Sequence, residues 1–314
     1  MSSLVVSANA VLPMFLIIAL GIALRRFSLI EEKVASALNN LVFLVLLPTL
    51  IFNNIRNADI YAVLHPRFIV FSVASCFGVW GLATLIAKLT LSDPLQKGAF
   101  IQGMARSNFV LFGLPMYINL YGTGQAGLIS FMVGVVTPVF NLLAILTLET
   151  YRHSAVKPSQ VGRGIITNPL IIASAAGVVF MLLRIPLPEF LNIALANLGG
   201  ATTPIALLVL GSLLTPAGIK GRLLPLSVAV TGKLIIIPAI VLPAAIAIGF
   251  RGHDLATLVA IFASPTAVAS FVMARKLESD GELAAEIVVF STLFSGVTVF
   301  LWVFVMHFNG LLVI

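Results

Sequence analysis

Two segments of the sequence combine a proline with polar side chains that are suited to binding a small anion. Their candidate residues are Arg106, Asn108, Gly113 and Pro115 in the first segment and Ser264, Pro265, Thr266 and Ser270 in the second. Because proline removes a backbone donor and glycine relaxes the chain, we expect each segment to be a broken helix, interrupted at Pro115 and at Pro265. The amides at such a break are free to bind an anion. Two ordinary proline kinks, with the hydroxyl and amide side chains satisfying the backbone, are the alternative.

Lys233 is a further candidate because it lies eleven residues after Arg222 inside an apolar run. At a rise of about 1.5 Å per residue it reaches roughly 16 Å into a membrane, near the middle of a ~30 Å hydrocarbon core. Charges at that depth are costly and usually functional. The alternative, which also applies to Arg106, is a long side chain that extends towards the interface. A weaker group of candidates, which either line a cavity or are structural, consists of Thr49, Asn53 and Thr203.

The elements that must position these residues are membrane-spanning helices. Of the 314 residues, 60% are hydrophobic and 9% are charged, whereas a soluble domain carries roughly 25% charged residues. An apolar run of ~20 residues crosses the bilayer as one helix. Such runs occur at residues 4–24, 34–55, 68–89, 98–117, 127–148, 165–183, 191–214, 223–250, 255–274 and 287–308. The sequence therefore predicts an all-α integral membrane protein with ten transmembrane helices.

The distribution of charge predicts the orientation of the chain and the sign of its ligand. Of the 18 Lys and Arg residues, twelve lie in the odd-numbered connections, four in the even-numbered ones, and Arg106 and Lys233 within spans. Since basic residues collect in cytoplasmic loops, we expect both termini on the periplasmic or extracellular side of the cell (inner) membrane. No Asp or Glu is central to a span, which favours an anionic substrate. The net charge of +7 is dispersed over short loops, so nucleic acid is not an expected partner.

The metal and redox chemistry open to the chain is limited. Cys76 is the only cysteine, so a disulfide within the chain and a cysteine metal site are excluded. The four histidines lie far apart and form no metal-binding spacing. We expect neither a metal nor a cofactor. No motif of an intramembrane protease or prenyl transferase is visible, so we do not expect an enzyme.

A constant offset of 156 residues relates the two halves of the sequence. It carries Pro13 and Gly21 onto Pro169 and Gly177, Pro48 onto Pro204, and Asn108 onto Ser264. The offset predicts a duplicated five-helix unit, with repeats at residues 1–148 and 165–314 and a short cytoplasmic connection at 149–164. Because five is odd, the two repeats insert in opposite directions. Inverted repeats of this kind recur in secondary transporters.

Several of these motifs together resemble a known family. The matching positions are Leu12 and Pro13 through Gly21, Leu47 to Phe52, Asn108 with Gly113 and Pro115, Pro204 to Gly211, and Ala263 with Phe271 to Arg275. The pattern resembles the auxin efflux carrier family, which includes plant auxin exporters and bacterial malonate or dicarboxylate carriers. The resemblance implies two inverted five-helix repeats, with the fourth and ninth helices crossing as broken helices beside the substrate. It also implies transport of an organic carboxylate without ATP.

Two departures from the family pattern matter. Ser270 stands where the plant carriers have a second crossing proline, so the break in the ninth helix is expected nearer Pro265. The connection from Glu149 to Gly164 is short, whereas the plant carriers have a long hydrophilic central loop. In this respect the chain is similar to the bacterial branch.

The leading hypothesis is a secondary active transporter that moves a small organic anion by alternating access. The anion is expected to be a mono- or dicarboxylate, such as malonate or an auxin-like acid. A cation/proton antiporter of related inverted-repeat fold and a passive anion channel are the alternatives. The expected partners are the substrate and the lipid bilayer, while a coupling proton or sodium ion and a homodimer stay open.

Overall fold

The computed structural model describes residues 2–58, 65–152, 167–213 and 222–312. Within these ranges the regular secondary structure is helical, apart from one isolated antiparallel bridge between Ser107 and Thr266. The predicted connection at 149–164 falls largely outside the described residues.

The helices follow the apolar runs of the sequence. In the first half they are α1 (Ser3–Arg26), α2 (Glu32–Leu41), the π-helix η1 (Val42–Leu46), α3 (Leu47–Arg56), α5 (Pro66–Thr90), α6 (Pro94–Ala105), the π-helix η2 (Phe109–Gly113), α7 (Leu114–Tyr121), the short 3₁₀ turn η3 (Thr123–Gln125) and α8 (Gly127–Arg152). In the second half they are α10 (Pro169–Leu183), α11 (Glu189–Leu213), α12 (Leu223–Thr231), the π-helix η4 (Gly232–Ile236), α13 (Ile237–Ile248), α14 (Gly252–Phe262), α15 (Val268–Lys276) and α16 (Gly281–Phe308). The local sequence determines where α6 and α10 begin. Asp93 and Asn168 are their N-cap residues, and each is followed by a proline, which is favoured in the first turn of a helix.

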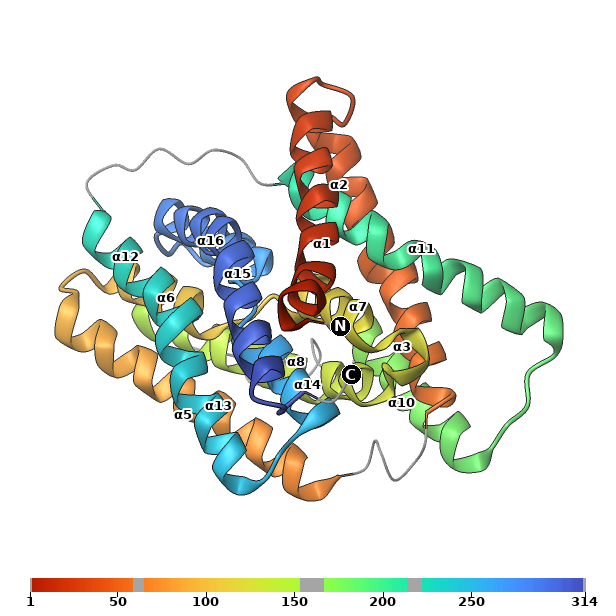
Figure 1. Ribbon diagram of the computed structural model, residues 1–314. Helices are drawn as coiled ribbons and strands as arrows, with labels where there is room; N and C mark the ends of the chain where they lie inside the picture. The colour runs from red at the N-terminus through yellow and green to blue at the C-terminus, as the bar shows by residue number, and fades with distance from the viewer. Residues whose placement is uncertain (1, 59–64, 153–166, 214–221, 313–314) are drawn as a thin grey trace.

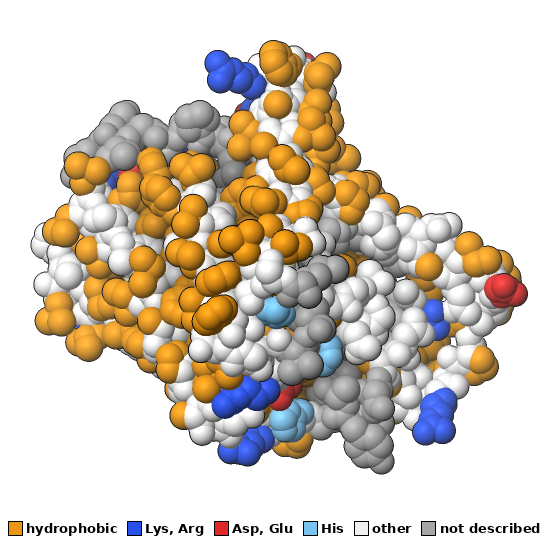
Figure 2. All heavy atoms as spheres, in the orientation of Figure 1, with side chains coloured by type: hydrophobic (Ala, Val, Ile, Leu, Met, Phe, Trp, Pro, Cys, Tyr) orange, Lys and Arg blue, Asp and Glu red, His pale blue; other side chains and the backbone are white. Residues whose placement is uncertain are grey.

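Seven described helical stretches are long and apolar enough to cross a membrane. They are Ser3–Arg26, Glu32–Arg56, Pro66–Thr90, Gly127–Tyr151, Glu189–Leu213, Leu223–Ile248 and Gly281–Phe308. Three further apolar helices are shorter: Phe109–Tyr121, Pro169–Leu183 and Gly252–Phe262. Large hydrophobic side chains cover much of the visible surface (Figure 2), as expected where the solvent is lipid. The protein is therefore an all-helical integral membrane protein, while the count of ten spans stays a prediction.

The helices gather into two groups (Figure 1). The first group contains α1, α2, α3, α10 and α11, and the second contains α5, α6 and the helices from α12 to α16. α8 packs against both groups, through α3 and α10 of the first and α5 and α6 of the second. α7 packs against α1 of the first group and against α14 of the second. The candidate site lies where α6, α7, α14 and α15 meet.

The break predicted in the fourth apolar run is present, but its predicted position at Pro115 is wrong. The helix is interrupted at residues 106–108, and from Phe109 to Tyr121 it continues as η2 and α7 with Pro115 in the first turn of α7. The physical reason is the π-helical turn before the proline, which absorbs the missing backbone hydrogen bond without a break. The same order, a π-helix ending two residues before a proline, occurs at Pro48 and Pro238.

The break predicted in the ninth run is present at the expected place. α14 ends at Phe262 and α15 begins at Val268, so Pro265 lies inside the interruption.

Candidate functional site

The two broken helices cross at their interruptions and pair through the backbone. The amide of Asn108 donates a 2.8 Å hydrogen bond to the carbonyl of Pro265, and the amide of Ala267 donates a 3.4 Å hydrogen bond to the carbonyl of Arg106. These bonds form the antiparallel bridge between Ser107 and Thr266. Non-helical backbone inside a membrane is tolerated only where such groups find partners in the protein. The crossing therefore satisfies the backbone amides of Asn108 and Ala267.

Buried side chains support the crossing from both sides. Thr266 donates a hydrogen bond of 2.6 Å from Oγ1 to the carbonyl of Gly103, and its amide donates to Oγ of Ser291 at 3.1 Å. The side-chain amide of Gln102 donates to the carbonyl of Ser270 at 2.8 Å. Since an unsatisfied buried group costs free energy, this network fixes the breaks in one geometry.

Gly113 allows the two crossing segments to approach closely. A Cβ atom at this position would lie 2.6 Å from the carbonyl oxygen of Ala260 and 2.9 Å from Oγ of Ser264. The contact leaves no room for a side chain, so η2 packs with its backbone against α14. Asn108 pairs with Pro265 and Gly113 lies against Ala260, so the spacing between these two residues is set by the packing of the crossing segments.

A cavity of about 250 Å³ opens beside the crossing. Its polar lining residues are Asn39, Arg106, Ser107, Asn108 and Thr137, and its apolar ones are Phe43, Phe109, Val110, Leu111, Phe140, Leu170, Ala267, Val268, Ala269, Val272 and Met273. None of these lining residues is acidic. The first residues of η2 and of α15 are among them, and no side chain caps either helix start. Uncapped amides of a helix start are donors for an anion.

Arg106 is the cation of this cavity. It directly follows α6 and is 8% exposed, so its side chain is buried. Its Nη2 donates to Oδ1 of Asn141 at 2.7 Å, and its Nη1 lies 2.6 Å from Sδ of Met273. These contacts are neutral, and therefore the guanidinium charge is available to a ligand.

Three further polar atoms at the cavity are buried without a hydrogen-bond partner among the described residues. They are Nδ2 of Asn108, Oγ of Ser107 and Oγ1 of Thr137. Each such atom costs free energy unless it is paired. A carboxylate can accept hydrogen bonds from a side-chain amide and from hydroxyl groups.

Two of the twelve predicted site residues, Arg106 and Asn108, line the cavity. Pro265, Thr266, Ser264, Ser270 and Gly113 instead build the crossing, with the Ser264 hydroxyl donating to the carbonyl of Ala260 at 2.6 Å. Pro115 is buried in α7. These residues position the site and do not line it.

The remaining predicted residues lie elsewhere. The Thr49 hydroxyl donates to the carbonyl of Val45 within its own helix. Asn53 accepts hydrogen bonds of 3.1 and 2.9 Å from Arg56. Thr203 is half-buried on α11 and is not part of the cavity lining. The structure does not bring these three to the crossing.

Lys233 is fully buried in η4, yet it does not line the cavity. Its Nζ has no hydrogen-bond partner among the described residues. The side chain therefore lies inside the protein, and a role of Lys233 in the anion path stays a prediction.

The predicted candidates did not include the other polar lining residues, which are Asn39, Ser107 and Thr137. They also did not include the two residues that contact the Arg106 guanidinium, Met273 and Asn141. Asn141 and Thr137 lie within the apolar helix α8. A polar side chain in such a helix indicates that the residue faces the protein interior or a cavity. The sequence alone does not say which of the other helices such a side chain faces.

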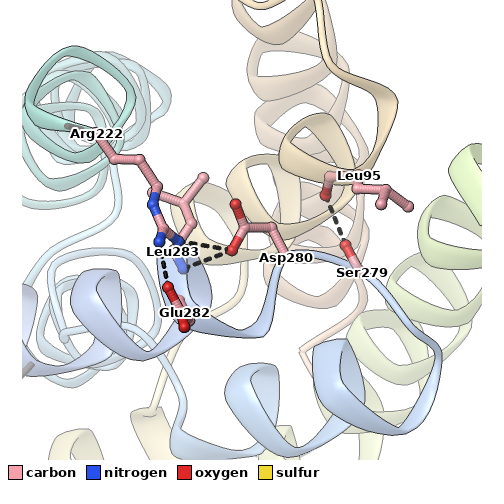
Figure 3. Close-up of polar contacts among 6 residues, drawn as sticks. All are labelled: Leu95, Arg222, Ser279, Asp280, Glu282 and Leu283. Atoms are coloured by element: carbon pink, nitrogen blue, oxygen red, sulfur yellow. Dashed lines mark hydrogen bonds and ion pairs between the residues drawn. The ribbon is translucent and has the colours of Figure 1, made fainter. Parts of the chain in front are cut away.

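An ion-pair network closes the opposite end of α15 (Figure 3). Nη1 of Arg222, before α12, lies 2.9 Å from Oδ1 of Asp280, and Nη2 pairs with Glu282. Asp280 also caps α16 by accepting from the amide of Leu283 at 2.9 Å. The hydroxyl of Ser279 donates to the carbonyl of Leu95 at 2.7 Å. The connection after α15 is thus fixed to the starts of α6, α12 and α16.

The apolar helical fold, with two broken helices crossing beside an internal cavity, defines a membrane transporter. Residues 6–303 match the family described as membrane transport protein, that of the auxin efflux carriers, and the chain belongs to this family. An uncharacterized transporter of Methanocaldococcus jannaschii is 23% identical over 303 residues, which cover 94% of this chain and 97% of the relative. An uncharacterized transporter of Methanothermobacter thermautotrophicus is 25% identical over 301 residues, with the same coverage of 94% and 97%. The family predicted from the sequence motifs is thus confirmed.

Proposed function

We propose that the protein is a secondary active carrier that moves a small organic anion across the cell membrane by alternating access. The observation that carries this proposal is the chemistry of the cavity. A buried guanidinium, the unpaired side-chain amide of Asn108 and two uncapped helix starts face a space whose lining residues include no acid. Donors and positive charge without a carboxylate suit an organic acid and do not suit a cation, so the antiporter alternative is disfavoured.

The cavity wall favours a carboxylate with an apolar body. Phe43, Phe109 and Phe140 line it together with Leu170 and Val272. A volume of about 250 Å³ suits a small ligand. We therefore propose that Arg106 binds the carboxylate and the aromatic side chains contact the rest of an auxin-like monocarboxylate, in preference to malonate, whose second charge would face apolar wall.

Exchanged contacts support two inverted repeats, at 1–148 and 165–314, with ten spans. A Cβ atom at Gly21 on α1 would clash with the carbonyl oxygen of Leu208 on α11, and a Cβ atom at Gly177 on α10 would lie 3.2 Å from the carbonyl oxygen of Phe52 on α3. Gly177 lies 156 residues after Gly21, and Leu208 lies 156 residues after Phe52. A two-fold relation between repeats produces this exchange.

Thr202 offers a second sign of the same relation. Its hydroxyl donates a 3.0 Å hydrogen bond to the carbonyl of Leu46, which lies 156 residues earlier. The offset of 156 residues makes Leu46 the equivalent of Thr202 in the first repeat. A hydrogen bond between two equivalent positions is expected where both lie beside a two-fold axis that relates the repeats. In such carriers one group of helices moves against the other around a central site.

Uptake by purified protein in proteoliposomes tests the function. We expect saturable uptake of an aromatic monocarboxylate, weaker uptake of malonate, and faster uptake when the vesicles are preloaded with the same acid. Arg106→Gln should lower affinity roughly thirtyfold, since a charged hydrogen bond contributes about 2 kcal/mol. Arg26→Gln, which changes an exposed arginine at the end of α1, is the matched control and should leave uptake unchanged.

Two outcomes would contradict the proposal. Uptake that neither saturates nor responds to preloading would indicate the passive anion channel. Equal uptake by the wild type and by Arg106→Gln would show that the cavity at the crossing is not the anion site.

A further inference from the structure

Titratable side chains gather at the end of the molecule where both termini lie, which we call the terminus rim. Nδ1 of His307 in α16 lies 2.9 Å from Oγ of Ser3 in α1, so the first and last helices share this end. His65, directly before α5, and Asp254, in the first turn of α14, form an ion pair with 3.3 Å between Nδ1 and Oδ2. Figure 2 shows histidine, acidic and basic side chains side by side on this part of the surface. The pair connects the starts of two helices from different parts of the chain.

Besides His65, a second imidazole belongs to this cluster, that of His253, which directly precedes Asp254 in the sequence. Nδ1 of His253 lies 2.7 Å from Oη of Tyr117 in α7. The same tyrosine donates to the carbonyl of Gln125 at 3.2 Å, and the ring of Tyr121 lies 4.3 Å from that of His253. The cluster therefore joins α5, α7 and α14.

Two arginines lie next to this cluster, and both are bound to backbone carbonyls. Nη2 of Arg67 donates to Ile248 at 2.8 Å and its guanidinium lies over the ring of Phe250. Nη1 of Arg251 donates to Ile246 at 2.9 Å and to Phe250 at 2.7 Å. Both arginines are bonded to the end of α13. Among the described ion pairs, Asp254 is paired with His65 and with neither arginine. His65 is thus the ion-pair partner of Asp254.

The cluster lies on the two helices that continue from the breaks away from the cavity lining. α7 and α14 are the halves of the broken helices that face the terminus rim. At the crossing they are tied through Asn108 and Pro265, and at the rim through Tyr117 and His253. Opening the cavity towards this rim requires the rim contacts to separate.

The opposite rim is held by groups of a different kind. There Arg222 pairs with Asp280 and Glu282, and Ser279 bonds to a backbone carbonyl (Figure 3). Arginine and carboxylate groups ordinarily keep their charges between about pH 5 and 8, whereas an imidazole gains its charge in that interval. Of these two rims, the terminus rim therefore has the ion pair whose strength changes near neutral pH, that between His65 and Asp254.

We propose that His65, Asp254 and His253 form a proton-binding site that makes opening towards the terminus rim depend on pH. The proposal rests on the proposed alternating access of the carrier. When His65 is protonated, its charge attracts the Asp254 carboxylate and holds the start of α14 against the start of α5. When the proton leaves, this attraction is lost and the rim opens more readily. Acid therefore favours the closed rim, and neutral to alkaline pH favours opening.

Hydrogen exchange of the purified protein in lipid nanodiscs tests this without any substrate. The readout is the protection of amides at 252–258, corrected for the intrinsic effect of pH on exchange, at about pH 5.5 and about pH 8, on either side of the imidazole range. Since a half-exposed ion pair contributes little, we expect protection to be roughly two- to fivefold greater in acid for the wild type. His65→Gln and Asp254→Asn should each abolish that difference while circular dichroism shows an unchanged helix content.

Two control variants make the result specific. His307→Gln removes an imidazole at the same end but outside the cluster, and should keep the pH dependence of the wild type. Asp280→Asn weakens the opposite rim, and should lower protection at the start of α16 equally at both pH values. A His65→Gln variant that keeps the acid-dependent protection would overturn the proposal. Because no anion is used, this failure is distinguishable from a failure of Arg106→Gln to affect uptake.

Discussion

The side chain of Asn141 positions Arg106: its Oδ1 accepts a 2.7 Å hydrogen bond from Nη2 of the guanidinium. Asn141 belongs to α8 and Arg106 to the end of α6, so the contact joins two helices that enclose the cavity. The guanidinium has five N–H donors. The contacts with Asn141 and Met273 use two nitrogens and leave further donors for a ligand.

Asn141 is predicted to be a positioning residue for the anion. Asn141→Leu should raise the KM for uptake roughly tenfold with little change in the maximal rate, because the misplaced guanidinium loses about 1.4 kcal/mol of binding free energy. Asn141→Gln, which keeps the acceptor, should recover part of the affinity. Asn309→Leu, an exposed change at the end of α16, is the control, and an unchanged KM for Asn141→Leu would remove this role.

Thr266 is predicted to stabilise the crossing. Thr266→Val removes the hydroxyl that bonds to Gly103 at 2.6 Å and leaves that buried carbonyl unpaired, so it should cost about 1–3 kcal/mol of unfolding free energy. Melting followed by circular dichroism in detergent should show the lower Tm. Thr298→Val removes a hydroxyl bonded within its own helix on an exposed face and should change Tm little; equal effects of the two variants would argue against the crossing as a stabilising element.

Lys233 is predicted to lower the unfolding free energy of the protein and to contribute to anion transport. Its buried Nζ has no hydrogen-bond partner among the described residues. Lys233→Met should therefore raise the unfolding free energy by on the order of 1–3 kcal/mol, the typical cost of an unpaired buried polar group. We expect the same variant to transport anion more slowly, since it removes positive charge from the membrane interior. Lys88→Met, at an exposed position of α5, is the control, and unchanged uptake by Lys233→Met would exclude the lysine from the anion path.

The orientation of the chain gives a fourth prediction. In a variant with Cys76→Ala, single cysteines at Ser3 and Asn309 should react with an impermeant thiol reagent added to whole cells. A cysteine at Ser159, which lies outside the described residues, should react only after permeabilisation. Labelling of the Ser159 position alone in intact cells would reverse the topology predicted from the loop charges.

The positions of the helices follow largely from local sequence. A run of about twenty apolar residues has one low-energy arrangement in lipid, a helix with all backbone groups paired. The apolar runs therefore coincide with the described helices, for example at 68–89 within α5 and at 287–308 within α16. Arg106 and Asn108 were identifiable because polar groups inside an apolar run are costly and need a reason.

The geometry of the site was decided by tertiary structure. A proline in the sequence does not say whether the helix breaks there or relaxes through a π-turn: at Pro265 the backbone finds partners in the crossing segment, and before Pro115 the π-helix η2 keeps the chain helical. The lining of the cavity likewise combines α2, α8, α10 and α15 with the first break. Asn141 meets Arg106 across 35 residues of sequence and His65 meets Asp254 across the two halves of the chain. Such contacts depend on how helices pack against one another, and the pattern of apolar residues along one helix specifies which face is buried but not which neighbour it meets.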